Sequence, residues 1–279
     1  MESKEFAVFI LTHGRPDNVK TVSTLKKCGY TGKIYFIVDN EDKTINRYIK
    51  NFGVDSVIVF DKKAMADKVD EGNNFDERRT ITHARNACFE IAKQIGITYF
   101  IQLDDDYSQF KFRFENKLGY EAKVNNINKV FETFINFLDS HSNIKSIAFS
   151  QGGDHIGGFS TTKLKRKCMN SFICSTNKEF QFIGAMNEDV NTYTSLGSRG
   201  DLFFTFTSVQ LDQAQTQSQQ SGITDMYLKY GTYCKAFTTV MMHPSAVKVS
   251  MMNTSNVRIH HLIKWNNTTP MILKSKYKK

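Results

Sequence analysis

Three consecutive aspartates, Asp104, Asp105 and Asp106, follow an apolar run at residues 99–103. The run has the length of a buried strand, and ligands of open α/β sheets bind beyond strand ends. Side chains alternate along a strand, so Asp104 and Asp106 should point one way and Asp105 the other. Adjacent carboxylates repel one another, and oxygen ligands in this pattern suit Mg²⁺ or Mn²⁺, which would also bind a substrate diphosphate. A solvated acidic turn is the alternative, but the surrounding motifs favour a metal site.

Short apolar runs alternate with helical patterns in the first half of the chain and would position these aspartates. The predicted strands span residues 6–11, 33–38 and 56–60, together with the run that ends at Asp104. The predicted helices span residues 45–52 and 82–95, and an earlier one carries Val19, Val22 and Leu25, with Asp17 as a candidate N-cap. Strands separated by helices predict an α/β fold with a mainly parallel sheet.

The second half has a less regular pattern. Its predicted elements are a helix at residues 123–140, strands at 146–150, 172–183, 202–207 and 238–242, a polar segment from 187 to 201, and a short helix at 224–231. Residues 210–222 are rich in Gln, Ser and Thr, which fits a linker or an acceptor-facing loop equally well. The glycine-rich residues 152–158 lack the spacing of a dinucleotide-binding fingerprint. We expect a single domain.

Composition limits the class of protein. With 279 residues, 40% hydrophobic and 23% charged, the chain is long enough for one large globular domain. Its net charge of +9 favours nucleic acid, an anionic membrane or nucleotide phosphates as partners, unless it serves solubility alone. Five scattered cysteines without a C-x-x-C pair indicate reduced thiols in a cytoplasmic protein. The charged first residues predict no signal peptide, and no apolar stretch approaches the length of a membrane span.

Several segments resemble the GT-A glycosyltransferases in their order and spacing. They are the strand at residues 6–11, the strand ending in Val38-Asp39-Asn40, the helix opening with His83-Ala84-Arg85-Asn86, the strand ending in Asp104-Asp105-Asp106, and the downstream Glu188-Asp189. The tail from Arg258-Ile259-His260-His261 to Pro270 resembles phage-encoded glycosyltransferases that decorate 5-hydroxymethyl pyrimidines in hypermodified DNA. The resemblance implies a Rossmann-like GT-A fold with a smaller acceptor-side lobe. Residues 1–120 would bind the nucleotide sugar, 121–240 would face the acceptor, and 241–279 would close the site.

The resemblance also implies which residues bind the donor. The turn after the first strand would contact the nucleotide through Thr12, His13, Gly14 and Arg15. Asp39 would hold the uracil or ribose, and Asp104 and Asp105 would lie near the ribose or donor sugar. Arg85 would reach the diphosphate or the sugar, although a helix-cap salt bridge is the alternative. Arg258 and Lys264 would assist at the diphosphate.

Metal binding and catalysis are assigned on the same basis. Asp106 would ligate Mn²⁺ or Mg²⁺, and a C-terminal histidine, His260 or His261 rather than His243, would complete the site. Asp189 would act as the general base of an inverting transfer, with Glu188 as the second candidate. In a retaining enzyme neither needs to act as a base. The alternative to a catalytic role is that Glu188-Asp189 caps a helix after residues 184–187.

The implied acceptor is a hydroxymethylated pyrimidine that must leave the DNA stack. The candidates for stacking on this base are Tyr107, Phe110, Phe112 and Trp265, and Gly222 and Asp225 are further acceptor-side candidates. Basic runs at residues 163–167 and 274–279 would hold DNA phosphates.

We therefore expect a cytoplasmic glycosyltransferase, in the host cytoplasm if the chain is phage-encoded. It would transfer glucose or a pentose such as arabinose from a UDP-sugar to DNA, with Mn²⁺ or Mg²⁺. Three alternatives remain open: the same fold acting on a protein, glycan or cell-wall polymer, a Mg²⁺-dependent nucleotidyltransferase, and a non-catalytic nucleic-acid-binding module. The sequence makes no prediction about the oligomeric state.

Overall fold

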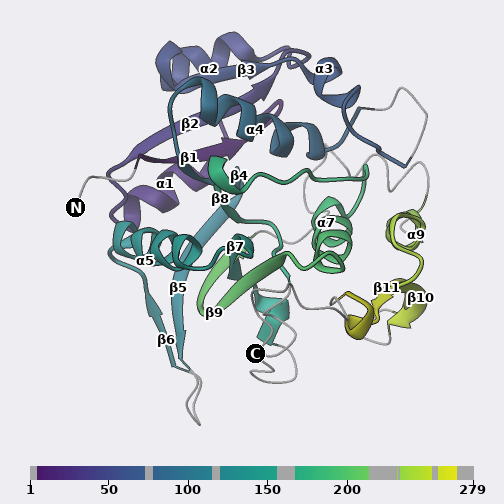
Figure 1. Cartoon of the computed structure of the whole chain (residues 1–279). Helices are drawn as coiled ribbons and strands as arrows, with labels where there is room; N and C mark the ends of the chain where they lie inside the picture. Colours follow the sequence, from purple (N-terminus) through teal and green to yellow (C-terminus); the bar gives the residue numbers. More distant parts are fainter. Residues whose placement is uncertain are drawn as a thin grey trace.

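The computed structural model describes residues 5–72, 78–114, 120–155, 167–213, 231, 233–252 and 257–268, with a mixed sheet at the centre (Figure 1). The sheet has nine strands in the order β3-β2-β1-β4-β8-β7-β9-β5-β6. The strands are β1 Phe6–Leu11, β2 Lys33–Asp39, β3 Val57–Phe60, β4 Tyr99–Asp104, β5 Tyr107–Phe114, β6 Tyr120–Lys123, β7 Ile144–Ser150, β8 Phe172–Ser175 and β9 Leu202–Gln213. Only β5 and β8 run against the other strands of this sheet. The mainly parallel α/β sheet expected from the sequence is confirmed.

Helices cover both faces of the sheet. They are α1 Lys20–Lys27, α2 Ile45–Phe52, α3 Lys62–Ala66, α4 Thr82–Gln94, α5 Ile127–Ser140, α7 Glu188–Gly197 and α9 Tyr233–Met242. The short 3-10 helices are η1 Val54–Ser56, η2 Gly152–His155, η3 Thr176–Lys178 and η4 Trp265–Thr268. Apolar residues of α1, α2 and α5 belong to one core, and those of α3, α4 and α7 belong to a second core.

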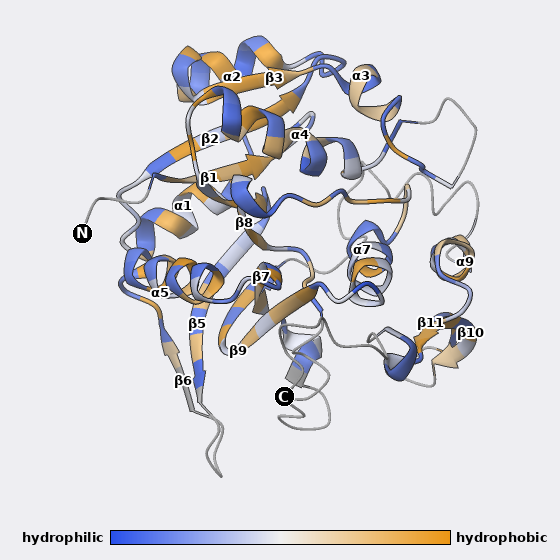
Figure 2. Cartoon of the chain, viewed as in Figure 1, coloured by the Kyte–Doolittle hydropathy of each residue, from blue (hydrophilic) through white to orange (hydrophobic). Residues whose placement is uncertain are grey.

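The side chains of β1 alternate between these two cores. Val8 and Ile10 pack on the side of α1, α2 and α5, whereas Ala7 and Phe9 pack on the side of α3, α4 and α7. All four are fully buried. A strand buried on both faces reads as a continuous apolar run, and Figure 2 shows hydrophobic residues concentrated along β1 and β2.

Parallel pairing brings the carboxyl ends of β1, β2 and β4 to one edge of the sheet. Leu11, the last residue of β1, pairs with Asp104, the last residue of β4. On its other side Leu11 pairs with Ile37, two residues before the end of β2. The polar turn after β1, the side chain of Asp39 and the aspartates after β4 therefore lie along one edge, where ligands of open α/β sheets bind.

Several element boundaries differ from the sequence-based expectations. Helix α5 begins at Ile127 rather than at residue 123, because Asn126 caps it by accepting a hydrogen bond from the backbone N–H of Lys129. Strand β8 ends at Ser175, and the polar segment expected after residue 187 is helix α7. Strand β9 continues to Gln213, so the start of the Gln-rich segment belongs to the sheet. Residues 214–230 lie outside the described residues, and so do Gly222 and Asp225.

Two local predictions were wrong. Asp17 does not cap α1, whose N-cap position is Val19, because its carboxylate pairs with Arg47 and Asn51 of α2 instead. Residues 238–242 form the end of helix α9 rather than a strand.

A small C-terminal lobe stands beside α7. Strands β10 Val247–Met252 and β11 Arg258–Ile263 pair as a separate antiparallel hairpin. Helix α9 packs against both strands and against α7 (Figure 1). We refer to α9, β10 and β11 together as the C-terminal lobe. Among the described residues, no helix combines the length and apolar character needed to cross a membrane.

Candidate active site

Asp104 and Asp105 reach different partners, as side-chain alternation predicts. Oδ1 of Asp104 lies 3.4 Å from Nη2 of Arg85 in α4. Asp105 instead faces the turn after β1, where it accepts a hydrogen bond from Oγ1 of Thr12 at 2.7 Å and lies 3.3 Å from the guanidinium of Arg15. Burial raises the pKa of Asp105, although Arg15 and Thr12 favour its charged form. Asp105 thus ties the end of β4 to the first turn.

Asp106 lies in the turn between β4 and β5 and keeps one carboxylate oxygen without a partner. Its Oδ1 is buried and has no hydrogen-bond partner among the described residues. Burial raises the pKa of Asp106, even though a hydrogen bond with Gln213 favours the charged form. Asn170, whose φ is +61°, donates a hydrogen bond to Oε1 of Gln213 at 3.1 Å and so supports this arrangement. A buried carboxylate oxygen without a donor is a suitable ligand for a hard divalent cation.

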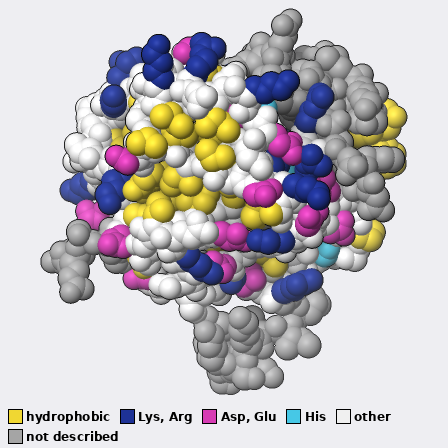
Figure 3. Space-filling model, turned by 90° about the horizontal axis from the view of Figure 1, so that it is seen from above, with side chains coloured by type: hydrophobic (Ala, Val, Ile, Leu, Met, Phe, Trp, Pro, Cys, Tyr) yellow, Lys and Arg dark blue, Asp and Glu magenta, His cyan; other side chains and the backbone are white. Residues whose placement is uncertain are grey.

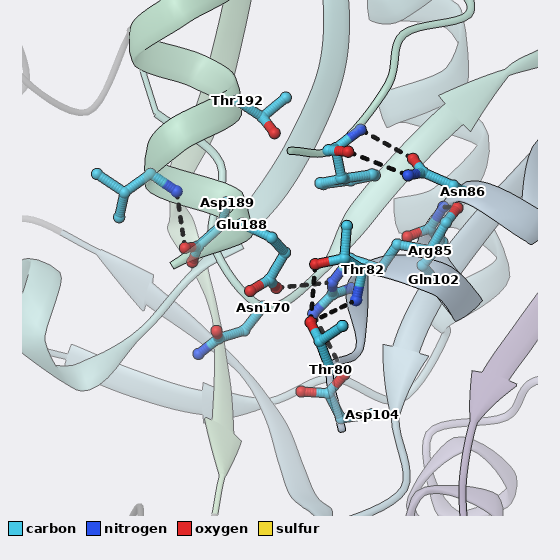
Figure 4. Close-up of polar contacts among 12 residues, drawn as sticks. Thr80, Thr82, Arg85, Asn86, Gln102, Asp104, Asn170, Glu188, Asp189 and Thr192 are labelled. Carbon is cyan, nitrogen blue, oxygen red and sulfur yellow. Dashed lines mark hydrogen bonds and ion pairs between the residues drawn. The ribbon is translucent and has the colours of Figure 1, made fainter. Parts of the chain in front are cut away.

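Arg85 connects the end of β4 to the start of α7 (Figure 4). Its Nε donates a hydrogen bond to Oε1 of Glu188 at 3.0 Å, and its Nη2 lies 3.4 Å from Asp104. The guanidinium stacks 4.7 Å from the ring centroid of Phe172 and is fully buried, and its Nη1 has no hydrogen-bond partner among the described residues. Arg85 therefore holds two carboxylates from distant parts of the chain and keeps one donor for a further anion. Its partners lie beyond its own helix, so it is not a helix-cap salt bridge.

The carboxylate of Asp104 has an unusual affinity for protons. Burial raises its pKa, and although Arg85 opposes this effect, the neighbouring Asp106 and Asp105 add to it, so that the pKa reaches about 7. Carboxylates whose negative charges are brought together in this way gain stability when a cation binds.

Removing the Arg85 side-chain charge should destabilise the protein. We expect Arg85→Met to lower the free energy of unfolding by about 3 kcal/mol at pH 8, because two buried carboxylates lose their cation. Part of this loss should disappear at pH 5, since the carboxylate of Asp104, whose pKa is about 7, is then protonated. Urea denaturation at the two pH values measures both effects. Arg47→Met is the matched control, because Arg47 and its partner Asp17 are each 60% exposed and such pairs contribute less than about 1 kcal/mol.

Glu188 and Asp189 open helix α7, and both are buried. Oδ1 of Asp189 accepts a hydrogen bond from the backbone N–H of Val190 at 2.7 Å (Figure 4). Burial and the neighbouring Glu188 raise the pKa of Asp189 to about 6. An acid with this pKa exchanges its proton near neutral pH, as a general base must. Asp189 therefore accepts a hydrogen bond at the start of α7 and also has a pKa suited to a general base.

His13 and Asp39 form the polar pair expected beyond β1 and β2. Their Nδ1 and Oδ2 atoms lie 2.6 Å apart, and Nζ of Lys62 lies 3.4 Å from Oδ1 of Asp39. The hydrogen bond with Asp39 raises the pKa of His13 against the effect of burial. Burial acts to raise the pKa of Asp39, but His13 and Lys62 outweigh it and lower the pKa overall. Asp39 is therefore a charged acceptor at neutral pH.

Asp42 and Tyr48, which the sequence did not identify as site residues, hold the turn after β1. The backbone N–H of Gly14 donates to Oδ2 of Asp42 at 2.7 Å, and the φ of Gly14 is +69°, which favours glycine. The hydroxyl of Tyr48 accepts a hydrogen bond from the backbone N–H of Arg15 at 2.9 Å and lies 2.8 Å from Oγ1 of Thr12. Both contacts join segments more than 25 residues apart, so local sequence patterns carried no signal for them.

The C-terminal lobe places His261 beside the start of α7. Its Nδ1 lies 3.3 Å from Nδ2 of Asn187, which also donates to the backbone oxygen of Lys235 at 2.9 Å. Burial, His260 and Lys235 lower the pKa of His261 to about 3, and burial, Arg258 and Lys235 lower that of His260. Both rings are thus neutral near pH 7, the form that binds a metal. The described residues nevertheless contain no group of three His, Cys, Asp or Glu side chains arranged to hold a metal ion.

The aromatic residues expected to stack on an acceptor base are engaged within the protein. Tyr107 and Phe110 are fully buried, and the hydroxyl of Tyr107 donates to the backbone oxygen of Asn170 at 2.5 Å. Neither ring offers a free face, so their assignment to the acceptor was wrong. Trp265 stacks on Tyr193 of α7, with ring centroids 6.0 Å apart and planes 9° apart, and so attaches the chain after β11 to α7.

Comparison with known proteins places this geometry in a family. The family model for TET-associated glycosyltransferases matches residues 6–222. No curated protein sequence matches the chain significantly. Among solved structures, a mannosyltransferase from Pyrobaculum calidifontis, solved with GDP-Man and Mn²⁺, is 9% identical, with a TM-score of 0.50 over 85% of this chain and 73% of the other. Glucosyl-3-phosphoglycerate synthase from Mycobacterium tuberculosis, solved with Mn²⁺, UDP and phosphoglyceric acid, is 10% identical, with a TM-score of 0.47 over 94% of this chain and 87% of the other.

The mannosyltransferase shares the fold, which confirms the GT-A architecture expected from the order of strands and motifs. The family match covers β1 to β9 and every carboxylate described above. The chain belongs to the TET-associated glycosyltransferases.

Proposed function

We propose that this glycosyltransferase transfers glucose or a pentose such as arabinose from a UDP-sugar to the hydroxymethyl group of a modified pyrimidine in phage DNA. The observation that carries the catalytic part is the buried Arg85, which lies between Asp104 at the end of β4 and Glu188 at the start of α7. Through this contact the end of β4, which would bind the diphosphate, lies next to the start of α7, which carries the proposed base Asp189. Family membership supports the sugar transfer, and the resemblance of the C-terminal tail supports the DNA acceptor.

The first half of the chain would bind the donor. Residues 1–120 supply the pair of His13 and Asp39 for the uridine and Arg85 for the diphosphate or sugar. The unpartnered Nη1 of Arg85 is a donor suited to a phosphate oxygen. Residues 121–240 would face the acceptor, and residues 241–279 would close the site.

The residues around Asp106 fit Mn²⁺ or Mg²⁺. Oδ1 of Asp106 is buried without a partner among the described residues, and the pKa of Asp104 is raised even though Arg85 lies beside it, so both carboxylates would be stabilised by a further cation. One or two carboxylates suffice for such an ion, because substrate phosphates and waters complete its coordination. His260 or His261 would supply one further ligand from the C-terminal lobe. When bound, the ion neutralises the diphosphate as it leaves.

Asp189 would then act as the base. The acceptor hydroxyl oxygen attacks the anomeric carbon as the bond to the diphosphate oxygen breaks, and the hydroxyl proton passes to the Asp189 carboxylate. Glu188 is held by Arg85 at 3.0 Å, which favours Asp189 over Glu188 for this step. The anomeric configuration inverts in this displacement.

The uridine contact has its own test. We expect Asp39→Asn to raise the KM for the UDP-sugar about tenfold with kcat nearly unchanged, because a hydrogen bond to a charged group is lost far from the reacting carbon. Asp55→Asn, at an exposed position in η1, should leave both constants unchanged. Equal effects of the two substitutions would remove Asp39 from the donor site.

The proposal as a whole is tested by ligand stabilisation followed by transfer. The melting temperature is measured with a panel of UDP- and GDP-sugars, with and without Mn²⁺, since a ligand that binds the native state raises its stability. The stabilising donor is then assayed on duplexes containing 5-hydroxymethylcytosine, 5-hydroxymethyluracil or unmodified bases, and on glycans. A Mn²⁺-dependent shift with one UDP-sugar and transfer to a hydroxymethylated duplex support the proposal. Transfer only to glycans, or stabilisation only by nucleoside triphosphates, contradicts it.

A further inference from the structure

The C-terminal lobe exposes large apolar side chains that a monomer normally buries. Helix α9 buries two small residues, Ala236 and Thr239, but leaves Tyr233, Phe237 and Met241 exposed by 52%, 50% and 55%. These three residues are four positions apart and therefore form one stripe along the helix. The apolar stripe of a surface helix ordinarily faces the core, so this orientation indicates a surface that another molecule covers.

The hairpin exposes further apolar side chains on both of its faces, because Val249, Met251 and Ile259 point to one side and Leu262, which pairs with Lys248, points to the other. Its exposed apolar side chains are Val249 and Met251 of β10, Ile259 and Leu262 of β11, and Val257 just before β11. Together with the α9 stripe, they account for most of the large exposed hydrophobic residues in the described part of the chain. We call this set, with Lys248 and Lys264, the lobe surface.

The excess positive charge of the protein is confined to the same end of the sequence. Residues 226–279 contain eight Lys, one Arg and no Asp or Glu, so their formal charge of +9 equals that of the whole chain. Residues 1–225 therefore hold 28 basic and 28 acidic residues and are neutral overall. Figure 3, which views the molecule from above, onto the side of α2, α3 and α4, shows both basic and acidic side chains on that face. The net charge thus belongs to one part of the sequence, and four of its nine cations, Lys235, Lys248, Arg258 and Lys264, lie in the described residues.

The lobe surface adjoins the candidate base. Asn187, the residue before Glu188 and Asp189, donates hydrogen bonds to the backbone oxygen of Lys235 and to Oγ1 of Thr239, both in α9. Its side chain also lies 3.3 Å from His261 of β11. A polyanion held on the lobe surface would therefore lie next to the start of α7.

We propose that the lobe surface is the DNA-docking surface of this enzyme, with its cations on the phosphates and the α9 aromatic pair supporting extrusion of the target base. This inference rests on the proposed DNA acceptor. Cations supply salt-dependent, sequence-tolerant affinity, and apolar side chains that enter a base step lower the cost of opening it. The rings of Tyr233 and Phe237 pack edge to face with their centroids 6.0 Å apart, and both side chains remain about half exposed. Charge favours DNA over a second copy of this chain, because two such cationic lobes would repel.

The test for phosphate contact uses a matched pair of lysines. Lys248→Ala alters the lobe surface, and Lys50→Ala alters an exposed lysine of α2. Binding of each full-length variant to a hydroxymethylated duplex is followed by fluorescence anisotropy over a salt series. We expect Lys248→Ala to reduce the slope of log K against log salt by about 1 and Lys50→Ala to leave it unchanged. Equal slopes for Lys248→Ala and wild type would overturn the proposal.

The test for base extrusion uses Phe237→Ala, with Val54→Ala as a control at another exposed apolar position, 67% exposed in η1. We expect Phe237→Ala to raise the KM for a fully paired duplex about tenfold. A mismatch opposite the target base should restore most of the loss, because such a base is already partly unpaired. A merely structural role of Phe237 would not show this rescue, and its absence would contradict the proposal.

The activity of the wild-type enzyme on DNA distinguishes an incorrect docking surface from an incorrect proposed function. Transfer to hydroxymethylated DNA with the lobe variants unaffected would overturn the docking surface and leave the function intact. Absence of transfer to any DNA by the wild type would overturn the function, and the docking proposal with it. Phe237-dependent binding to vesicles of phosphatidylglycerol without DNA binding would assign the lobe to an anionic membrane, and Phe237-dependent dimerisation would assign it to a second copy. Either result would overturn the DNA assignment.

Discussion

Asp106→Asn is expected to lower kcat/KM for sugar transfer by at least about a thousandfold, because a metal ion contributes several kcal/mol to stabilisation of the leaving diphosphate. The substitution preserves shape and removes the buried, unpartnered charge of Oδ1. The Mn²⁺-dependent thermal shift with the donor should disappear at the same time. In the absence of metal, the melting temperature should stay the same or rise, since a buried carboxylate no longer has to be ionised.

Asp17→Asn is the control for this experiment, because Asp17 is exposed and its carboxylate pairs with Arg47 and Asn51 of α2. It should change neither turnover nor the response to Mn²⁺. An Asp106→Asn enzyme with near-wild-type turnover would remove Asp106 from the metal site.

Asp189→Asn is expected to lower kcat about a thousandfold, since an amide cannot accept the proton of the acceptor hydroxyl. The dissociation constant of the UDP-sugar should change less than twofold, because the proposed role of Asp189 is toward the acceptor hydroxyl and not the donor. Single-turnover transfer and isothermal titration with the donor measure the two quantities. Donor binding that weakens in parallel with turnover would indicate a structural role at the start of α7 instead.

The pH dependence provides a second measurement for Asp189. Its pKa is raised from 3.8 to about 6, so kcat of the wild type should rise with pH through about 6 and then level off. The effect on stability has the opposite sign. Between pH 4 and pH 6 the native state holds a proton that the unfolded state has lost, so this group's contribution to stability falls as pH rises. Asp189→Asn should remove both dependences, and a kcat that does not change between pH 5 and pH 8 in the wild type would contradict the assignment.

The sequence predicted the parts of the fold that depend on local periodicity. The run at residues 6–11 is apolar throughout and almost entirely buried, so it is read as a strand without tertiary information. The run at residues 99–104 is read in the same way, although the buried Gln102 interrupts its apolar side chains before the terminal Asp104. The position of Asp104, Asp105 and Asp106 at a strand end followed directly. The opposite directions of Asp104 and Asp105 followed from backbone geometry alone.

Features that depend on distant partners could not be predicted in this way. Tyr107 was a candidate for stacking on the acceptor base as an aromatic residue, but its ring is buried and its hydroxyl donates to the backbone oxygen of Asn170, 63 residues later. Asp17 has the residue type of a helix cap, yet α2 supplies competing partners 30 and 34 residues away. Residues 238–242 were predicted as a strand, but they form the end of helix α9. A run of five residues is too short for periodicity alone to distinguish a strand from a helix.

The shared position of Arg85 has a consequence for the order of events in the catalytic cycle. One guanidinium neutralises both Asp104 and Glu188, so a diphosphate that binds to it draws its charge away from the start of α7. The two substrates should consequently bind interdependently, and thermodynamic linkage requires each to change the affinity of the other by the same factor. Initial rates measured over a grid of both substrates should give double-reciprocal lines that intersect away from the horizontal axis, whereas lines for substrates that bind independently would meet on that axis. The lysine of Arg85→Lys keeps the positive charge but lacks the planar fork with which arginine reaches both carboxylates. In this variant the interdependence of the two substrates should weaken even where transfer persists.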